Sequence, residues 1–369
     1  MSDMRAIRAE GERLFAFLQA NGGLPVDADI LQPAETLLDL YGEDIRARAY
    51  TTQDPNRGEL MMRPDFTVPV VQMHMAQGAE PARYTYLGEV FRKQEASAAR
   101  ASEYLQVGYE VFDRDNPAAA DAEVFALFSK ALAPLNLRPV TGDIGILMAA
   151  VDSLGTSDRR KRALRRHIWR PRRFRTLLDR FTGRSAPPAS RLALLEKAAS
   201  GIDSLLEAEG PQIGLRKPED IARRIRFLQA DAEAVMISSS EAEVLDTILG
   251  IRETLPNAYE HLRDVAVDLS GLTPALDRLE ARIEALGRAG VDVEQLPFEA
   301  NYGRTTMEYY DGFVFGLISE GRPDLPPIAS GGRYDALTRV LGGGREIPAV
   351  GGVIRPELVQ ALSRQEGDR

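Results

Sequence analysis

The sequence of 369 residues contains no cysteine. This absence excludes disulfide bonds, thiolate zinc sites and a cysteine nucleophile, and it is typical of proteins that work in the reducing cytoplasm. The three histidines, His74, His167 and His261, are far apart and do not have the spacing of metal ligands. We therefore expect a cytoplasmic protein that holds no metal ion and no cofactor.

Long apolar runs are also missing. A membrane-spanning helix needs about 18 to 20 consecutive apolar residues, and no stretch of the sequence approaches this length. The first 23 residues are charged and amphipathic, without the apolar segment of a signal peptide. The P-loop, the HExxH motif of zinc proteases and the GxSxG motif of serine hydrolases are absent as well. The sequence therefore predicts no contact with a membrane and none of these three reaction classes.

The formal charge of −9 is unevenly distributed. Residues 159–184 carry twelve Lys or Arg and one acidic residue, a balance of +11 that leaves −20 on the remainder. Such a basic segment can form solvated helices whose arginines neutralise acidic neighbours, contact another protein, or bind RNA. We favour the first of these interpretations and do not expect a nucleic acid partner.

The chain is too long for one ordinary hydrophobic core, so its length predicts at least two units. Residues 1–135 and 296–369 mix short runs of strand pattern with glycine turns, whereas residues 155–295 are rich in Ala, Leu, Arg and Glu at helical spacing. The simplest architecture is an α+β core domain, residues 1–150 with 296–369. A mostly helical insertion at residues 151–295 interrupts this domain.

Several predicted strands carry polar side chains on one face, because alternate side chains of a strand share a face. Three such faces contribute six polar residues: Asp65, Thr67, Gln106, Glu110, Tyr310 and Tyr334. A polar strand face is more often exposed to solvent, but three faces in one apolar-backed sheet favour a pocket for a small zwitterion. Asp65 and Glu110 would face an ammonium or imidazole group, since a buried carboxylate needs such a partner.

Five segments, in this order along the chain, resemble the catalytic core of histidyl-tRNA synthetases: ILQPAE (Ile30–Glu35), RPDFT, FRKQEASAARASEYLQVGYEVF, MEYYDGFVF and GGRYDAL. The resemblance covers residues 10–135 and 296–360. It implies an α+β fold with the antiparallel sheet of class II aminoacyl-tRNA synthetases, flanked by helices. ILQPAE is similar to the motif with which class II synthetases build their dimer interface, so a homodimer through the core is implied.

Where this family binds ATP, the sequence departs from the family's pattern. Arg92 and Arg100 are retained from the second motif, but four charged positions are replaced, by Gln94, Ser102, Thr305 and Leu358. Leu358 stands where the family has the arginine that holds the ATP phosphates, and Arg355 stands in place of a glycine. Because losing one cationic contact to the transition state costs about 3 kcal/mol, we expect no adenylate-forming activity.

One of these replacements concerns catalysis, and one further departure concerns the C-terminal part. The catalytic arginine of the family aligns with Thr305, and the neighbouring Arg304 is expected on the opposite face of a strand. Only eleven residues follow Leu358, so the resemblance implies that the family's anticodon-binding domain is missing.

The amino-acid side of the pocket is better preserved. The six polar residues of the predicted strand faces all match family positions that contact histidine, with Asp65 as a shortened version of a glutamate. The resemblance implies that the imidazole is bound by Glu110, Tyr310 and Tyr334. It implies that the α-amino group is bound by Asp65, Thr67 and Gln106.

A histidyl-tRNA synthetase-like chain with these losses resembles the regulatory subunits of ATP phosphoribosyltransferase, the first enzyme of histidine biosynthesis. The resemblance implies a subunit without catalytic activity of its own, which a short-form catalytic subunit requires and which confers feedback inhibition by histidine. It also implies a hetero-octamer of four regulatory and four catalytic chains. Two alternatives remain, namely a truncated synthetase or aminoacyl ligase, and an RNA-binding module that uses residues 159–184.

Overall fold

The computed structural model describes residues 4–35, 48–94, 101–208, 210, 214–305 and 309–367. Contacts group these residues into two compact units. The core unit contains the described residues up to Ile146, from Gly250 to Arg263 and from Thr273 onward, and the helical unit contains those of Leu147–Leu249 and Asp264–Leu272. The boundaries therefore differ from those expected, because residues 250–263 and 273–295 belong to the core unit and not to the insertion.

The centre of the core unit is a mixed sheet. Its described strands are nine, in the spatial order β1 (Leu24–Pro25), β5 (Ala82–Phe91), β6 (Glu103–Phe112), β12 (Ala349–Ile354), β11 (Ala329–Arg333), β10 (Phe313–Ile318), β7 (Arg138–Asp143), β9 (Pro297–Glu299) and β8 (Arg252–Thr254). The pairs β1–β5 and β7–β9 are parallel, and every pair from β5 to β7 is antiparallel. The expected antiparallel sheet is thus present in the middle, and parallel pairings make the whole sheet mixed.

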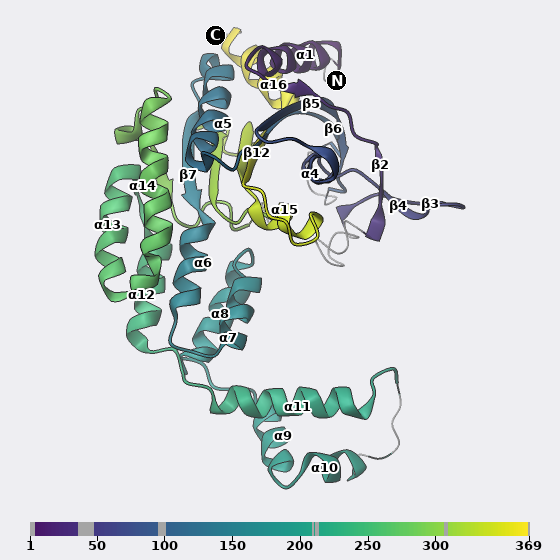
Figure 1. Cartoon of the computed structure of the whole chain (residues 1–369), viewed down its shortest axis with the longest axis vertical. Helices are drawn as coiled ribbons and strands as arrows, with labels where there is room; N and C mark the ends of the chain where they lie inside the picture. The colour runs from purple at the N-terminus through teal and green to yellow at the C-terminus, as the bar shows by residue number, and fades with distance from the viewer. Residues whose placement is uncertain are drawn as a thin grey trace. The chain divides into compact units, whose positions relative to one another are not determined.

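Helices cover both faces of this sheet (Figure 1). On one face α1 (Met4–Ala20) packs on β5 and β6, with Gly11 against Leu87 and Leu105, and α16 (Pro356–Gly367) contacts it. α5 (Pro117–Ala131) covers β6, β11 and β12 on the same face, where Phe128 lies against Gly352. The opposite face carries α4 (Thr67–Gln77) and α15 (Asp335–Leu341), which contact each other.

Residues 250–263 and 273–295 join the core unit through pairing and packing that local sequence pattern does not show. β8 pairs with β9 at the edge of the sheet, and α14 (Thr273–Arg288) packs on α5. The other short elements of this unit are η1 (Ala133–Leu135) and η3 (Val293–Gln295). A separate antiparallel sheet has the order β2 (Leu31–Pro33), β4 (Gly58–Met62), β3 (Thr51–Asp54), so ILQPAE contributes β2.

The described residues of the helical unit form helices. Those within it are α7 (Asp158–Arg166), α8 (Pro171–Phe181), α9 (Ala189–Ala199), α10 (Ile202–Ala208), α11 (Pro218–Glu233) and η2 (Ser270–Leu272). The unit boundaries fall within or at the ends of α6 (Ile144–Ser153), α12 (Ser239–Gly250) and α13 (Leu255–Asp268). Throughout the described ranges, no helix combines the length and apolar character that crossing a membrane requires.

The basic segment 159–184 forms α7 and α8, a pair of amphipathic helices. Their apolar side chains are buried, including Leu164, Phe174, Leu178 and Phe181. Arg160 is an exception to the exposed arginines, because it is only 5% exposed and donates to Asp231 Oδ1 at 3.0 Å. A helical pair whose arginines partly neutralise acidic neighbours agrees with the interpretation favoured from the sequence.

Candidate functional site

Glu110, near the end of β6, is the centre of a buried cluster of hydroxyl groups. Its carboxyl group accepts hydrogen bonds from Thr67 Oγ1 at 3.1 Å, Tyr86 Oη at 2.9 Å and Tyr334 Oη at 2.6 Å. Only 1% of Glu110 is exposed, and a buried carboxyl group is tolerated where such donors surround it. The three donors therefore hold Glu110 in one orientation on the sheet face that α4 and α15 cover.

Burial raises the pKa of Glu110 to about 7, although the hydrogen bonds from Tyr334, Tyr86 and Thr67 oppose this shift. Burial also raises the pKa of Tyr86 and Tyr334 well above that of an ordinary tyrosine. The hydroxyl groups consequently remain donors at neutral pH, whereas Glu110 gains or loses its proton there. A cationic ligand beside Glu110 would favour the ionised carboxylate.

Two glycines make room for this cluster. A Cβ atom at Gly351 of β12 would lie 1.5 Å from Glu110 Oε2, and one at Gly108 would lie 2.1 Å from Tyr86 Cζ. Tyr86 of β5 is paired with Gly108 of β6, so its ring crosses directly above the glycine. Tyr86 was not among the residues expected from the sequence. The signal that could have identified Tyr86 is its pairing with Gly108, the glycine between Gln106 and Glu110 on the polar face of β6.

Tyr310 joins the cluster through ring contacts. Its ring centroid lies 6.3 Å from that of Tyr334 and 4.7 Å from that of Tyr309. A Cβ atom at Gly332 would be 3.0 Å from the Tyr310 ring, so the ring lies against the backbone of β11. The expectation that Tyr310 belongs to a strand is wrong, because β10 begins at Phe313.

The remaining expected residues lie around this centre. Thr67 is the first residue of α4, so the extended run expected to place it on one face with Asp65 is wrong. Asp65 Oδ2 lies 3.7 Å from Arg92 Nη2, and its charge raises the pKa of Glu110. Gln106 is 1% exposed, and its Oε1 has no hydrogen-bond partner among the described residues. The structure thus links Thr67, Glu110 and Tyr334 by hydrogen bonds and leaves Gln106 with an unused acceptor.

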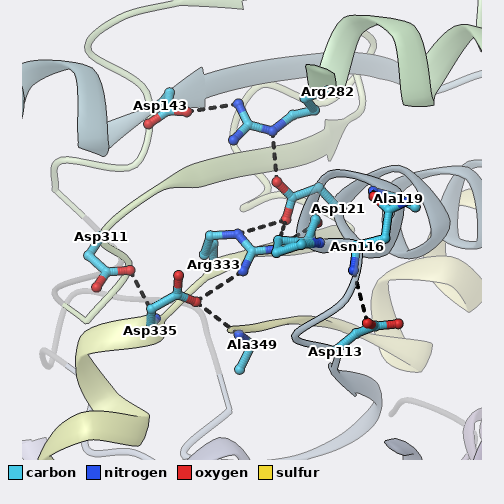
Figure 2. Close-up of polar contacts among 11 residues, drawn as sticks. Asp113, Asn116, Ala119, Asp121, Asp143, Arg282, Asp311, Arg333, Asp335 and Ala349 are labelled. Atoms are coloured by element: carbon cyan, nitrogen blue, oxygen red, sulfur yellow. Dashed lines mark hydrogen bonds and ion pairs between the residues drawn. The ribbon is translucent and has the colours of Figure 1, made fainter. Parts of the chain in front are cut away.

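A buried ionic network (Figure 2) lies on the opposite face of the sheet, the face that α5 covers. Arg333 donates to Asp121 Oδ1 at 2.7 Å and 3.1 Å and to Asp335 Oδ1 at 3.0 Å. Arg282 of α14 donates to Asp121 Oδ2 and to Asp143 Oδ2, both at 2.8 Å. Asp121 is 1% exposed and Arg282 is 3% exposed. The network ties α5, α14, β7 and β11 together inside the core unit.

The same network fixes the residues next to both pocket tyrosines. Asp311 accepts hydrogen bonds from the backbone nitrogens of Asp335 at 3.0 Å and Ala336 at 2.6 Å. Burial raises the pKa of Asp311 to about 7, and the nearby charge of Asp335 adds to the effect. Because Asp311 follows Tyr310 and Asp335 follows Tyr334, these contacts set the positions of the two rings.

The junction of β12 and α16 is a plain turn from strand to helix. Arg355 lies between the two elements, Pro356 begins the helix, and the amide of Leu358 donates to Arg355 O at 3.0 Å. Proline fits a first helical position because the N–H that it lacks would have no partner there. Arg355 Nη1 donates to Pro327 O at 2.6 Å, and Nη1 and Nη2 lie 3.4 and 3.3 Å from Ser330 Oγ. The arginine folds back onto the sheet.

The other arginines expected near a nucleotide are also engaged inside the protein. Arg92 donates through Nε to Pro64 O at 2.7 Å. Arg304 lies in a turn and not in a strand as expected, and it donates to Asn301 Oδ1 at 2.7 Å. Arg100 lies outside the described residues. In the described ranges, no three or more His, Asp or Glu side chains gather as a metal site would require.

The exposed arginines of the helical unit border a hollow of about 380 Å³ between α7 and α11. The residues that line it are Arg159, Arg162, Asp220, Arg223, Arg224 and Phe227. The guanidinium carbon of Arg159 lies 4.6 Å from the centre of the Phe227 ring. This basic hollow belongs to a different unit from Glu110.

Comparison with known proteins gives the context for this geometry. The family model described as histidyl-tRNA synthetase matches residues 2–245 and 225–359. The chain is 35% identical over 352 residues to the ATP phosphoribosyltransferase regulatory subunit of Brucella anthropi, covering 91% of this chain and 92% of that protein. It is 34% identical over 356 residues to the protein of the same name from Brucella canis, covering 92% and 93%.

Solved structures show the same fold. A protein from Bacillus halodurans, described as an ATP phosphoribosyltransferase regulatory subunit/histidyl-tRNA synthetase, superposes with a TM-score of 0.67 at 20% identity, covering 97% of this chain and 79% of that chain. Histidyl-tRNA synthetase from a Nostoc species superposes with a TM-score of 0.64 at 16% identity, covering 99% and 73%. At these identities the superpositions establish the fold of class II histidyl-tRNA synthetases, with its mixed sheet flanked by helices.

Proposed function

The chain belongs to the family of ATP phosphoribosyltransferase regulatory subunits, and we propose that it serves the first step of histidine biosynthesis as a non-catalytic subunit that the catalytic subunit requires. Its partner is accordingly a catalytic subunit of ATP phosphoribosyltransferase. The observation that carries this proposal is the identity of 35% over 91% of the chain to a protein of that name.

The geometry of the former nucleotide corner supports a role without catalysis. Leu358 stands where the synthetases have a phosphate-binding arginine, and Arg355 turns back to Pro327 and Ser330. Adenylate formation needs cations where charge builds up in the transition state, and each lost contact costs about 3 kcal/mol. Since Ser102 and Thr305 replace two more charged residues, the activation of an amino acid by ATP is not expected from this chain.

The finer parts of the proposal concern assembly. We infer that the partner is a short-form catalytic subunit, that four regulatory and four catalytic chains form a hetero-octamer in the cytoplasm, and that the regulatory chains form homodimers through the core. The segment Ile30–Glu35, which contributes β2, resembles the dimer motif of the synthetases and supports this arrangement. We equate the helical unit, Leu147–Leu249 with Asp264–Leu272, with the insertion inferred at residues 151–295.

The effector that we propose is histidine, bound on the Glu110 side of the sheet. Glu110, Tyr310 and Tyr334 are assigned to the imidazole, and Asp65, Thr67 and Gln106 to the α-amino group. Burial of Glu110 among neutral hydroxyl groups supports this assignment, because a basic ring would supply the charge that the carboxylate lacks. Feedback inhibition then equals the difference in histidine affinity between the active and inhibited arrangements of the complex, typically about 1–3 kcal/mol.

Reconstitution tests the whole proposal. The purified chain is mixed with a short-form catalytic subunit, and the rate of ATP phosphoribosyltransferase is measured with and without histidine. We expect co-elution, activity only in the mixture, and inhibition by histidine that is lost in the Glu110→Ala variant. Retained inhibition in that variant would place the effector site elsewhere.

Two further assays address the alternatives. Appreciable histidine-dependent ATP–pyrophosphate exchange by the chain alone would identify it as a ligase instead. Retention of tRNA at low salt, weakening steeply as salt is added, would identify the helical unit as an RNA-binding module.

A further inference from the structure

The register of the sheet brings Arg355 onto the face that carries Glu110. Gly351 is paired with Glu110 and Val353 with Gly108. Since side chains alternate along a strand, the same direction continued by two residues gives Arg355, opposite Gln106. Gln106, Glu110 and Arg355 therefore stand on one face of two neighbouring strands, although β12 itself ends at Ile354.

The guanidinium group lies against β11, the strand on the far side of β12 from β6. It contacts Ser330 Oγ at 3.3 Å. Ser330 is paired with Val353, and Val353 with Gly108, which is two residues from Glu110 on β6. At about 3.3 Å per residue and about 4.8 Å between strands, Ser330 lies roughly 7 Å along the strand and two strands across from Glu110, so about 12 Å from it. This interval suits a histidine molecule with its imidazole at Glu110 and its carboxylate at the opposite end.

Arg355 has no carboxylate within ion-pair distance among the described residues. Its side chain donates hydrogen bonds to neutral oxygens, those of Pro327 and Ser330. Burial lowers the pKa of the guanidinium, and the charged or polar groups that act on it most strongly are Tyr104, Arg92, Tyr302 and Tyr310, none of which is acidic. Arg355 is half-buried, and a guanidinium partly withdrawn from water without an anion is costly, so this side of the face is complementary to a negative charge.

Two neighbouring groups also have unused hydrogen-bonding capacity. Tyr302 Oη is buried without a partner in the described part of the chain. A Cβ atom at Gly316 would lie 1.8 Å from this oxygen, and Gly316 is paired with Ser330, so the hydroxyl reaches the level of the guanidinium. Gln106 Oε1, an acceptor, is likewise unsatisfied. A cation, a hydroxyl donor and an amide acceptor together match the carboxylate and ammonium groups of an α-amino acid.

We propose that Arg355, assisted by Tyr302, binds the α-carboxylate of the amino-acid effector and so determines that the site accepts a zwitterion. This inference rests on the proposed function, in which histidine binds with its imidazole at Glu110. The arginine occupies a position where the synthetases have a glycine. In the segment where the synthetases bind ATP, Arg355 thus serves to recognise the amino acid.

The test compares two ligands that differ only at the carboxylate, L-histidine and L-histidinamide. Binding to the complex of the full chain with a short-form catalytic subunit is measured by calorimetry, at a pH where both α-amino groups are protonated. We expect the wild-type complex to prefer histidine. Arg355→Met should weaken histidine about 10- to 100-fold, the range for hydrogen bonds to a charged group, and change histidinamide by less than about twofold.

Two variants serve as controls. Arg355→Lys keeps a cation and should recover part of the preference for histidine. Arg322→Met removes an exposed arginine of the core unit that pairs with Asp324, and it should leave both affinities unchanged. Unfolding curves of all variants establish that the chains are folded.

The outcomes separate this inference from the proposed function. If histidine binds the regulatory chain but Arg355→Met weakens both ligands equally, or the wild type binds both alike, Arg355 is not the carboxylate ligand. If histidine binds only the catalytic chains, the effector part of the proposed function is wrong and this inference with it.

Discussion

On the sheet face that α4 covers, Glu110 stands at one end and Arg355 at the other, and their charges are satisfied in opposite ways. Glu110 receives three hydrogen bonds from hydroxyl groups of the protein. Arg355 contacts neutral oxygens only and has no carboxylate partner among the described residues. At the Glu110 end, the protein's own hydroxyl groups surround a carboxyl group that can change its protonation. At the Arg355 end, the cation lacks an anionic partner among the described residues. Ligand recognition by such a face depends on charged groups that lack a partner in the protein as much as on groups that already have one.

The ionic network around Asp121 provides the test with the largest expected effect, because it binds Asp335, the residue after the Tyr334 that donates to Glu110. Arg282→Met leaves the buried carboxylates Asp121 and Asp143 without one of their cations. Breaking a buried pair in this way costs about 3–5 kcal/mol. We expect the free energy of unfolding, measured with urea, to fall by this amount. A loss below about 1 kcal/mol would show that the network does not support the face.

The pH dependence of the free energy of unfolding tests the protonation state of Glu110. The pKa of Glu110 is about 7 in the folded chain against an ordinary value of 4.5, so the folded state binds more protons than the unfolded state between these pH values. The free energy of unfolding should therefore fall as pH rises from about 4.5 to about 7, by at most about 3 kcal/mol.

The Glu110→Gln variant isolates this contribution, because a glutamine does not titrate. Asp311 also has a pKa of about 7 and remains in the variant, so some dependence on pH should persist. Urea unfolding at a series of pH values gives the difference between the two proteins. Equal slopes in wild type and variant would mean that Glu110 is ionised throughout.

Gly351→Ala should disturb the Glu110 end alone. The added Cβ would meet Glu110 Oε2 at 1.5 Å and the backbone oxygen of Tyr109 at 2.8 Å, so the carboxyl group must leave its hydroxyl donors. Overpacking of this kind costs about 1–3 kcal/mol. The melting temperature should fall, and inhibition by histidine should weaken. The matched variant Gly321→Ala, where nothing lies within 4 Å of the new atom, should behave as wild type.

Arg355→Met has the smallest expected effect on stability, and its sign is opposite. Removing a cation without an anionic partner should stabilise the ligand-free chain by roughly 1 kcal/mol, even though two neutral hydrogen-bond acceptors lose their donor. For a chain of this size, the melting temperature should rise by about 2 °C. A decrease of similar size would show that the guanidinium is there to hold Pro327 and Ser330, and the contrast between the two ends would disappear.

Sequence pattern predicted the elements that follow from local periodicity. The alternation along β6 correctly placed Gln106, Gly108 and Glu110 on one face, and the helical spacing of residues 159–184 correctly predicted helices. Local pattern failed where a strand ends, so that Thr67 begins α4 and Tyr310 precedes β10. An extended run and the first turn of a helix differ by a few torsion angles that packing decides.

The contacts that define the site arise from pairings between distant segments, and these are not visible in a single sequence. Tyr86 reaches Glu110 only because β5 and β6 pair in one particular register. Arg282 and Asp121 are 161 positions apart. The resemblance to the synthetases correctly gave the fold, and its six pocket residues remain a prediction until ligand binding is measured.

The place of β12 in the sheet has a consequence for how the protein folds during its synthesis. This strand is synthesised after both of its neighbours, yet it lies between β6 and β11 in the sheet. Until it arrives, both neighbours expose open backbone edges that invite pairing with other nascent chains. The sheet can therefore close only after Ala349–Ile354 has been translated, and ribosomes that stall before Ala349 would release a chain prone to aggregation.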